Sequence, residues 1–327
     1  MTATVKKILG TAKRYVLNRI NHPAIILIYH RVSNLIEDPQ LLSVTPEHFY
    51  EQADYLKKNF SLLGIEEFSD YLKNGEPMPP RSVVLTFDDG YADNYCEALP
   101  ILESLGAQAL FYITTSNLDT RYELWWDELE RILLGDHALP PYLETYNGTQ
   151  VIRLSTSGTA ERLKSYCSMY PLCKYAAPVE RNRMIANLRQ SAGISAAGRE
   201  SHRLMTTKEL KHLSDSSSSV VGAHTVNHPV LSILDYEQQQ EEIIQSKLFL
   251  ENLLGYPVQH FSYPYGSKKD YNKESARICH ETGFKMVCAN FHGQVHSWTN
   301  CFELPRILVR NWDKEFFSQY MTKIFKY

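Results

Sequence analysis

Seven short apolar segments, spaced along the chain, most constrain what this sequence can fold into. Each has the length of a buried β-strand, and they occupy residues 24–29, 82–87, 108–114, 219–223, 258–263, 284–289 and 304–309. Helix signals lie between them, including Thr45-Pro46, with proline at the first helical position, and Thr206-x-x-Glu209, a capping box. Strands that alternate with helices form a parallel sheet or barrel. We therefore predict an α/β fold, a distorted (β/α)-barrel of seven to eight strands, similar to a TIM barrel.

Two stretches stand apart from this alternation. Residues 119–205 are aromatic and helical, with a second helical stretch from about 178 to 191, and we interpret them as a helical insertion in a single domain that spans residues 23–327. Residues 1–22 form a separate helical segment with the composition of a basic amphipathic helix. Such a helix either contacts a membrane surface peripherally or packs on its own domain, and the sequence leaves both open.

Composition excludes several classes of protein. The 34 basic and 37 acidic residues give a net charge of -3 without a long run of one sign, which argues against a nucleic-acid partner. The six cysteines form no C-x-x-C pair and are typical of a reducing compartment. We see neither a membrane-spanning apolar stretch nor a secretory signal, and therefore expect a cytoplasmic location. The sequence is silent on the oligomeric state.

Two polar motifs directly follow predicted strands. The first, Thr86-Phe87-Asp88-Asp89-Gly90, places two carboxylates together, which repel each other unless a cation intervenes. The second holds His224 and His228, two imidazoles that would reach one ion from the same side of a helical turn. Each motif alone has an ordinary reading, as an Asp-Gly surface turn or as a chance histidine pair. Because both end strands of one predicted sheet, we expect them at the same rim.

A third motif, Phe261-Ser262-Tyr263-Pro264-Tyr265-Gly266, forms a tight turn after a later strand. Such a turn can aim the backbone N–H of Tyr265 into the rim as an oxyanion donor, although an ordinary turn would have the same sequence.

Together the three motifs resemble the polysaccharide deacetylases of the chitooligosaccharide-deacetylase homology type, carbohydrate esterase family 4. The elements T-F-D-D-G, H-x-x-x-H and P-Y-G occur here in that family's order, and residues 28–32 and 304–307 resemble flanking motifs of its bacterial exopolysaccharide-synthesis branch. The resemblance implies a metal-dependent hydrolase that removes N-acetyl groups from an amino sugar in a polysaccharide, oligosaccharide or lipid-linked glycan. It implies one divalent ion, zinc first, with cobalt, nickel or manganese as alternatives.

Carried onto this chain, the resemblance gives Asp89, His224 and His228 as metal ligands and Asp88 as the catalytic base. The chain departs from the family pattern in two places, since it lacks the arginine before the Pro-Tyr-Gly turn and the late L-x-H motif of the general acid. We assign the first role to Arg306 and the second to His30, with His292 and His296 as alternatives to His30. A protonated His30 near a cation would need a neighbouring carboxylate.

Aromatic side chains suit a sugar site because pyranose rings stack on flat apolar faces. We therefore predict substrate contacts for Trp125, Trp126, Tyr263 and the adjoining Pro264, and packing of the two tryptophans against the barrel is the alternative. Two other functions stay open: a metal-dependent amidohydrolase for a non-carbohydrate amide, and a sugar-binding relative without catalysis.

Overall fold

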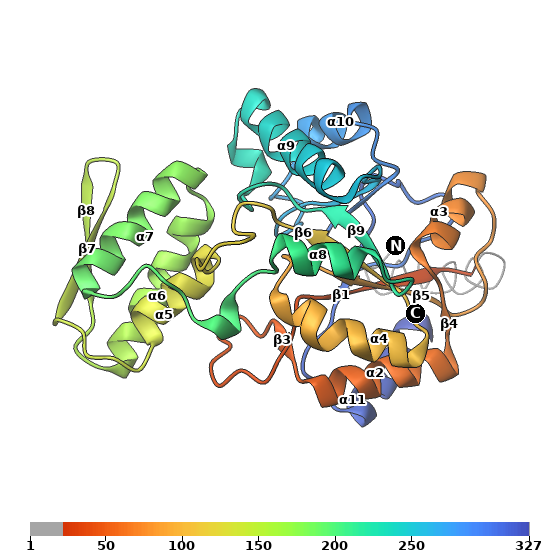
Figure 1. The fold of residues 1–327 in the computed structure, drawn as a ribbon, viewed down its shortest axis with the longest axis horizontal. Helices are drawn as coiled ribbons and strands as arrows, with labels where there is room; N and C mark the ends of the chain where they lie inside the picture. Colours follow the sequence, from red (N-terminus) through yellow and green to blue (C-terminus); the bar gives the residue numbers. More distant parts are fainter. Residues whose placement is uncertain (1–21, 327) are drawn as a thin grey trace, which may run out of the picture.

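A barrel of parallel strands lies at the centre of the computed structural model, which describes residues 22–326 (Figure 1). Its strand order is β11-β10-β9-β6-β5-β1-β12, and every neighbouring pair is parallel. The strands are β1 Ala24–Tyr29, β5 Ser82–Phe87, β6 Ala109–Ile113, β9 Ser219–Ala223, β10 His260–Ser262, β11 Met286–Cys288 and β12 Ile307–Leu308. Each of the seven predicted apolar segments contains one of them, so the distorted (β/α)-barrel is confirmed.

Residues 304–308 close the barrel between β11 and β1. Leu304 forms a parallel bridge with Cys288 of β11, and Ile307 then pairs with Leu27 of β1. The strands are short on this side, whereas β1 and β5 pair over six residues. The short strand β4 (Ser61–Leu62) adds to the start of β5. This uneven pairing makes the barrel irregular.

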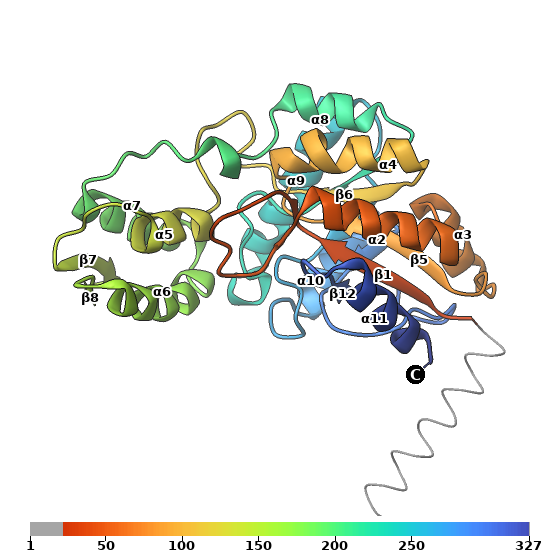
Figure 2. The same cartoon turned by 90° about the horizontal axis from the view of Figure 1, so that it is seen from below.

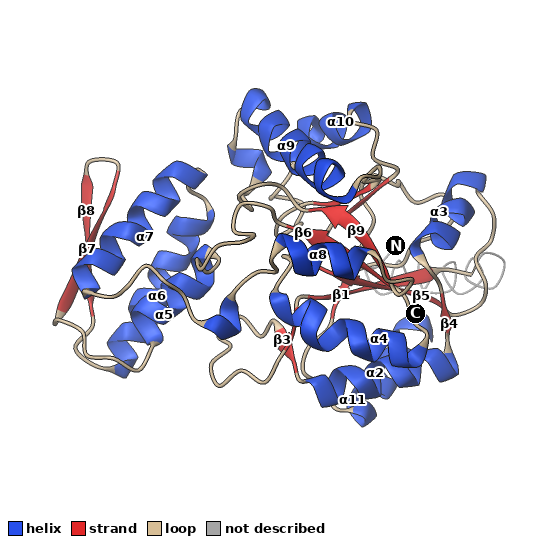
Figure 3. Cartoon of the chain, viewed as in Figure 1, coloured by secondary structure: helices blue, strands red, loops and turns tan. Residues whose placement is uncertain are grey.

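Helices surround the barrel (Figure 3). Their start signals agree with the sequence, because the Thr45 side chain caps α2 and Thr206 and Glu209 form a reciprocal capping box on α8. The helices outside the insertion are α2 Pro46–Asn59, α3 Ile65–Asn74, the π-helical turn η1 Asn94–Ala98, α4 Leu99–Leu105, α8 Thr207–Ser214, the short turn η3 Leu231–Ile233, α9 Tyr236–Leu254, α10 Lys273–Glu281 and α11 Lys314–Lys326. Two further short strands, β2 (Arg31–Val32) and β3 (Ser43–Val44), pair beside the barrel. Among the described residues, we find no helix with the length and apolar character to cross a membrane.

The chain between β6 and α8 projects from one side of the barrel (Figures 1 and 2). It consists of α5 Trp125–Leu134, the strands β7 Tyr142–Asn147 and β8 Gln150–Ser155, α6 Thr159–Lys174, α7 Pro178–Ala192 and the turn η2 Glu200–His202. The antiparallel hairpin β7–β8 was not predicted, because its residues are largely exposed and carry little apolar alternation. The predicted N-terminal helical segment falls, except for residue 22, outside the described residues.

Candidate active site

The polar motifs meet at one rim because their strands run parallel and end side by side. Asp88 and Asp89 follow β5, His224 follows β9, and Tyr265 lies in the turn after β10. The Asp88 N–H donates to the Tyr29 carbonyl at 3.0 Å and the His224 N–H donates to the Ile113 carbonyl at 3.0 Å, so both residues extend the strand ladder. The fold thus brings together residues that are more than 130 positions apart in the sequence.

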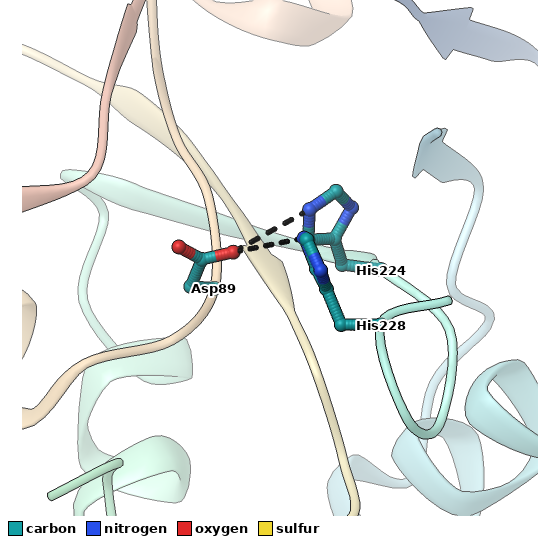
Figure 4. Close-up of side chains that lie close together, drawn as sticks. All are labelled: Asp89, His224 and His228. Atoms are coloured by element: carbon teal, nitrogen blue, oxygen red, sulfur yellow. Dashed lines mark ion pairs between the residues drawn. The ribbon is translucent and has the colours of Figure 1, made fainter. Parts of the chain in front are cut away.

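Asp89, His224 and His228 converge on one point (Figure 4). The Asp89 Oδ1 atom lies 3.6 Å from His224 Nε2 and 3.3 Å from His228 Nε2, and all three side chains are buried. Their ligand atoms all lie within 4.8 Å of one another. One carboxylate and two imidazoles, drawn together in this way, form a donor set that suits zinc and similar divalent ions.

The hydrogen bonds of these residues fit a bound cation. His224 Nδ1 lies 2.7 Å from the Ser262 carbonyl, which can only accept, so Nδ1 carries the proton and the neutral ring presents a lone pair at Nε2. The facing Asp89 Oδ1 has no hydrogen-bond partner within the described part of the chain. Burial raises the pKa of Asp89, with the Asp88 charge adding to it, and burial lowers the pKa of both histidines. A divalent ion would satisfy all three atoms, would reverse the shift of Asp89, and would favour the neutral form of both histidines.

The backbone around the site is strained. Asp89, Thr225, His228 and Tyr265 have φ angles of 78°, 65°, 51° and 59°, in the left-handed region that side-chain-bearing residues rarely adopt. The expectation that the histidines share a helical turn is therefore wrong: residues 224–228 form a loop with no helical hydrogen bonds. The tight reversal at Thr225 and His228, rather than a helix, turns both rings toward Asp89.

Arg306 holds Asp88 through a two-pronged ion pair. Its Nη1 donates to Asp88 Oδ1 at 2.7 Å and its Nη2 donates to Asp88 Oδ2 at 2.6 Å, while Nε donates to the Ala289 carbonyl. Burial acts to raise the pKa of Asp88, but the Arg306 guanidinium and His224 outweigh it and leave that pKa below its usual value. Asp88 is therefore ionised, fixed in orientation, and 3.7 Å from His224 Nε2.

His30, which follows β1, lines the same pocket as Asp88. Burial lowers the pKa of His30 to about 4, and the Asp88 charge, which acts in the opposite direction, is too weak to prevent this. Asp88 is the neighbouring carboxylate that a protonated His30 would need, but Arg306 already pairs with it. The His30 ring is thus neutral at pH 7.

The pocket at this rim has a volume of about 300 Å³. Its lining includes His30, Asp88, Asp89, Trp126, Tyr170, Lys174, His224, His228, Tyr265 and Asn290. The Trp126 ring packs 4.8 Å from the His228 ring and the Tyr265 ring 4.6 Å from it. The Tyr265 turn depends on Gly266, since a Cβ there would meet the Asn290 nitrogen at 2.5 Å. Of the predicted substrate-binding residues, Trp126 lines this pocket.

The other three predicted substrate-binding residues do not line this pocket. Trp125 donates from Nε1 to the Tyr265 hydroxyl at 3.1 Å and faces a separate cavity beside α7. Tyr263 stacks on Tyr271 in the core. Ser262, the last residue of β10, reaches Arg306 in the barrel interior, and the next side chain along extended backbone points the other way. Pro264 is buried in the turn.

Comparison with known proteins identifies the family of this chain. The family model for polysaccharide deacetylase matches residues 75–140 and 186–287, about half of the chain. The chain belongs to the polysaccharide deacetylase family. It is accordingly a carbohydrate deacetylase, a hydrolase that acts on carbon-nitrogen bonds other than peptide bonds, and its family is generally metal-dependent.

Three proteins illustrate the relationship. The Bacillus subtilis (strain 168) protein YxkH, provisionally named a polysaccharide deacetylase, is 21% identical over 285 residues, which cover 87% of this chain and 70% of YxkH. The poly-beta-1,6-N-acetyl-D-glucosamine N-deacetylase of Escherichia coli (strain K12) is 31% identical over 97 residues, 29% of this chain and 14% of that enzyme. The structure of Streptococcus pyogenes deacetylase PplD in complex with acetate has a TM-score of 0.60 at 20% identity, covering 92% of this chain and 99% of PplD.

The family match includes some site residues and leaves others outside. Asp88, Asp89, His224 and His228 lie within it, whereas His30 and Arg306 do not. Residues 141–185, which hold the hairpin, α6 and the first half of α7, are also unmatched. Sequence reasoning did not identify Lys174 and Tyr170, which reach the pocket from α6, because a lysine and a tyrosine in an ordinary helix carry no local signal.

Proposed function

We propose that this deacetylase binds one divalent metal ion through Asp89, His224 and His228 and hydrolyses the N-acetyl group of an amino sugar in a glycan. One observation carries the proposal: three buried ligand atoms converge beside an ionised, arginine-paired carboxylate in a small pocket. A pocket that only bound sugar would not need a base fixed next to a set of metal ligands.

The ion, when bound, would polarise the amide carbonyl and lower the pKa of a water molecule at the site. Zinc is the ion that a carboxylate and two imidazoles favour, and cobalt, nickel and manganese remain alternatives. The three residues leave room in the pocket for water and substrate, which distinguishes a catalytic set from a closed structural one.

Asp88 serves as the general base. Its carboxylate is ionised and oriented by Arg306, and it accepts a proton from the water that attacks the amide carbon. A C–O bond forms and the carbonyl oxygen becomes negative. We assign the backbone N–H of Tyr265, a residue that lines the pocket, as the hydrogen-bond donor to that oxygen.

His30 delivers a proton to the leaving nitrogen. When the C–N bond breaks, the nitrogen must gain a proton, and a neutral imidazole can relay one by accepting it at one ring nitrogen and donating from the other. Asp88, which now holds the proton from water, shares the pocket with His30 and supplies it. The products are acetate and a free amino sugar, and Asp88 returns to its ionised form.

The substrate class follows from the family and from one relative. The relative from Escherichia coli is named for a polymer of N-acetylglucosamine, and we propose an N-acetylated glycan of this kind for the present chain. Trp126 gives the pocket one flat apolar wall for a sugar ring.

Acetate release from N-acetylated glucosamine oligomers, measured with and without a chelator, tests this function. We expect release that stops with the chelator and returns when zinc is added. Release from simple non-sugar acetamides at an equal rate would favour a general amidohydrolase. Oligomer binding without any release under either condition would favour a sugar-binding protein.

A further inference from the structure

The loop that carries His228 has a strained backbone. Thr225 and His228, at its two ends, both have positive φ, and the Thr225 hydroxyl accepts a hydrogen bond from the His228 N–H at 3.0 Å. Such conformations persist when surrounding contacts hold them. Two side chains, one from the barrel and one from the insertion, provide these contacts.

Glu242, on α9 of the barrel, accepts hydrogen bonds from N–H groups of the loop. Its Oε2 accepts from the backbone N–H groups of Val226 and Asn227 at 2.9 and 2.8 Å, and its Oε1 accepts from Asn227 Nδ2 at 2.7 Å. The carboxylate is buried and makes all of these bonds to adjacent residues of the loop. The middle of the loop is thereby fixed to the barrel.

Arg181, on α7 of the insertion, donates hydrogen bonds to backbone carbonyls of the loop. Its Nη1 donates to the carbonyl of His228 at 3.1 Å and its Nη2 donates to the carbonyl of Asn227 at 2.6 Å. The side chain is 3% exposed, and its guanidinium lies 5.6 Å from the centre of the Trp125 ring. A planar guanidinium can hold two carbonyls at a fixed separation, which a lysine ammonium does not do.

His228 needs this support more than His224 does. The Nδ1 atom of His224 is anchored on the Ser262 carbonyl, as second contacts usually anchor metal-binding histidines. The Nδ1 atom of His228 has no hydrogen-bond partner among the described residues. Ring packing by Trp126 and Tyr265 limits its tilt, but the position of its Cα depends on the loop backbone.

We propose that Arg181 is a positioning residue for the metal site, so that the insertion holds His228 in place for the ion. The inference rests on the proposed metal site and adds to it a residue that the family match does not include, since Arg181 lies in the unmatched residues 141–185. Arg181 acts through the backbone of His228 and touches no reacting atom.

A purely electrostatic effect of Arg181 would have the opposite sign. A guanidinium near a divalent cation repels it, so loss of the charge alone would tighten metal binding. Loss of the two hydrogen bonds would instead loosen the loop and weaken binding. Weaker metal binding by the variants would therefore indicate positioning by Arg181, and tighter binding would indicate an effect of its charge alone.

The experiment compares zinc dissociation constants, measured by competition with a chromogenic chelator, for the full chain and its variants. Arg181→Lys keeps the charge but loses the paired geometry, and Arg181→Met loses both. Arg189→Met is the control, because Arg189 lies on the same helix and pairs with Glu128 at 2.6 Å without touching the loop. Thermal unfolding of the metal-free proteins is recorded alongside.

We expect both Arg181 variants to bind zinc about 10- to 100-fold more weakly, as is usual for loss of a group that orients a metal ligand, and Arg189→Met to bind as the wild type does. Unchanged affinity in Arg181→Lys and Arg181→Met would overturn the proposal, as would tighter binding by Arg181→Met. A lower metal-free unfolding temperature with unchanged affinity would show a merely structural role. If Arg181→Met does not fold, Arg181→Lys decides. Failure of the wild type to bind zinc, cobalt, nickel or manganese would instead contradict the proposed metal site, and this inference with it.

Discussion

Arg306 and Asp88 form a buried pair in which both terminal nitrogens of the guanidinium meet both oxygens of the carboxylate, at 2.7 and 2.6 Å. The two residues are 218 positions apart, and Arg306 precedes β12 while Asp88 follows β5. The same guanidinium also donates to the Ser262 hydroxyl at 2.7 Å. One side chain thus connects the closing segment of the barrel, the base and the end of β10.

Loss of Arg306 is expected to harm both stability and the base. Arg306→Met leaves a buried carboxylate without its partner, which destabilises proteins by about 3–5 kcal/mol. It also removes the charge that lowers the pKa of Asp88, so the acid limb of the activity profile should move to higher pH. Chemical denaturation and a pH–rate profile measure the two effects. A variant with wild-type stability and an unmoved acid limb would contradict this account of the pair.

Replacement of the proposed base should slow the reaction without release of metal. Asp88→Asn keeps the size of the side chain but cannot accept the proton from water, and we expect a loss of about a hundredfold or more in kcat. Metal content, measured by mass spectrometry, should stay at the wild-type value. Loss of metal from this variant would mean that Asp88 and Asp89 exchange roles.

Removal of one proposed metal ligand should release the metal, in contrast to replacement of the base. His228→Ala leaves two of the three ligands, and we expect both bound metal and activity to be lost while the circular dichroism spectrum is retained. His280→Ala serves as control, because His280 is exposed and lies outside the pocket. Stoichiometric metal in His228→Ala would refute the ligand assignment.

The role of His30 can be tested with two substrates. His30→Ala should keep its metal, lose most activity on an N-acetyl amide, and lose much less on an acetate ester whose leaving group departs without a proton. Equal losses on both substrates would argue against a role in protonation. A selective amide defect in His296→Ala would move that role to the C-terminal region.

Asp127 should make stability depend on pH. Burial raises the pKa of this carboxyl to about 7, while Arg31 opposes the rise, and the carboxyl accepts a hydrogen bond from the Tyr91 hydroxyl at 2.7 Å. Because the folded pKa lies above the unfolded one, the contribution is full below about pH 4 and is lost as the pH rises through about 7. In Asp127→Asn, this dependence should disappear, and the variant should be more stable than the wild type at pH 8. Unfolding in a chelator between pH 4 and 8 measures it, and parallel curves for the two proteins would disprove the assignment.

The parts of the fold and site that the sequence predicted are those with local signals. Parallel strands buried on both faces are continuous apolar segments, so β1, β5 and β9 were predicted with their observed bounds. Asp88 and Asp89 stood out because adjacent carboxylates after such a strand are unusual. Tyr263 was misplaced because the strand that it follows, β10, is only three residues long, too short for the alternation of its faces to be clear.

The parts that the sequence did not predict depend on contacts between distant segments. Glu242 lies in an ordinary polar helix and Arg181 follows the start of another, and both act on the backbone of the loop before His228. Every residue type has a backbone carbonyl, so a hydrogen bond to that group does not restrict which residue stands at the position. No pattern in a single sequence therefore marks such a pair, although its geometry is plain in the structure.

The left-handed residues around the site also bear on how the enzyme can change. Asp89 and His228 cannot become glycine without loss of a proposed metal ligand. Thr225→Gly would relax the backbone but remove the hydroxyl that binds the His228 N–H. Selection for thermostability alone would favour relief of this strain, whereas selection for activity would retain it. Directed evolution toward a more robust catalyst should consequently find its gains in the barrel helices and the exposed hairpin, and leave these few positions untouched.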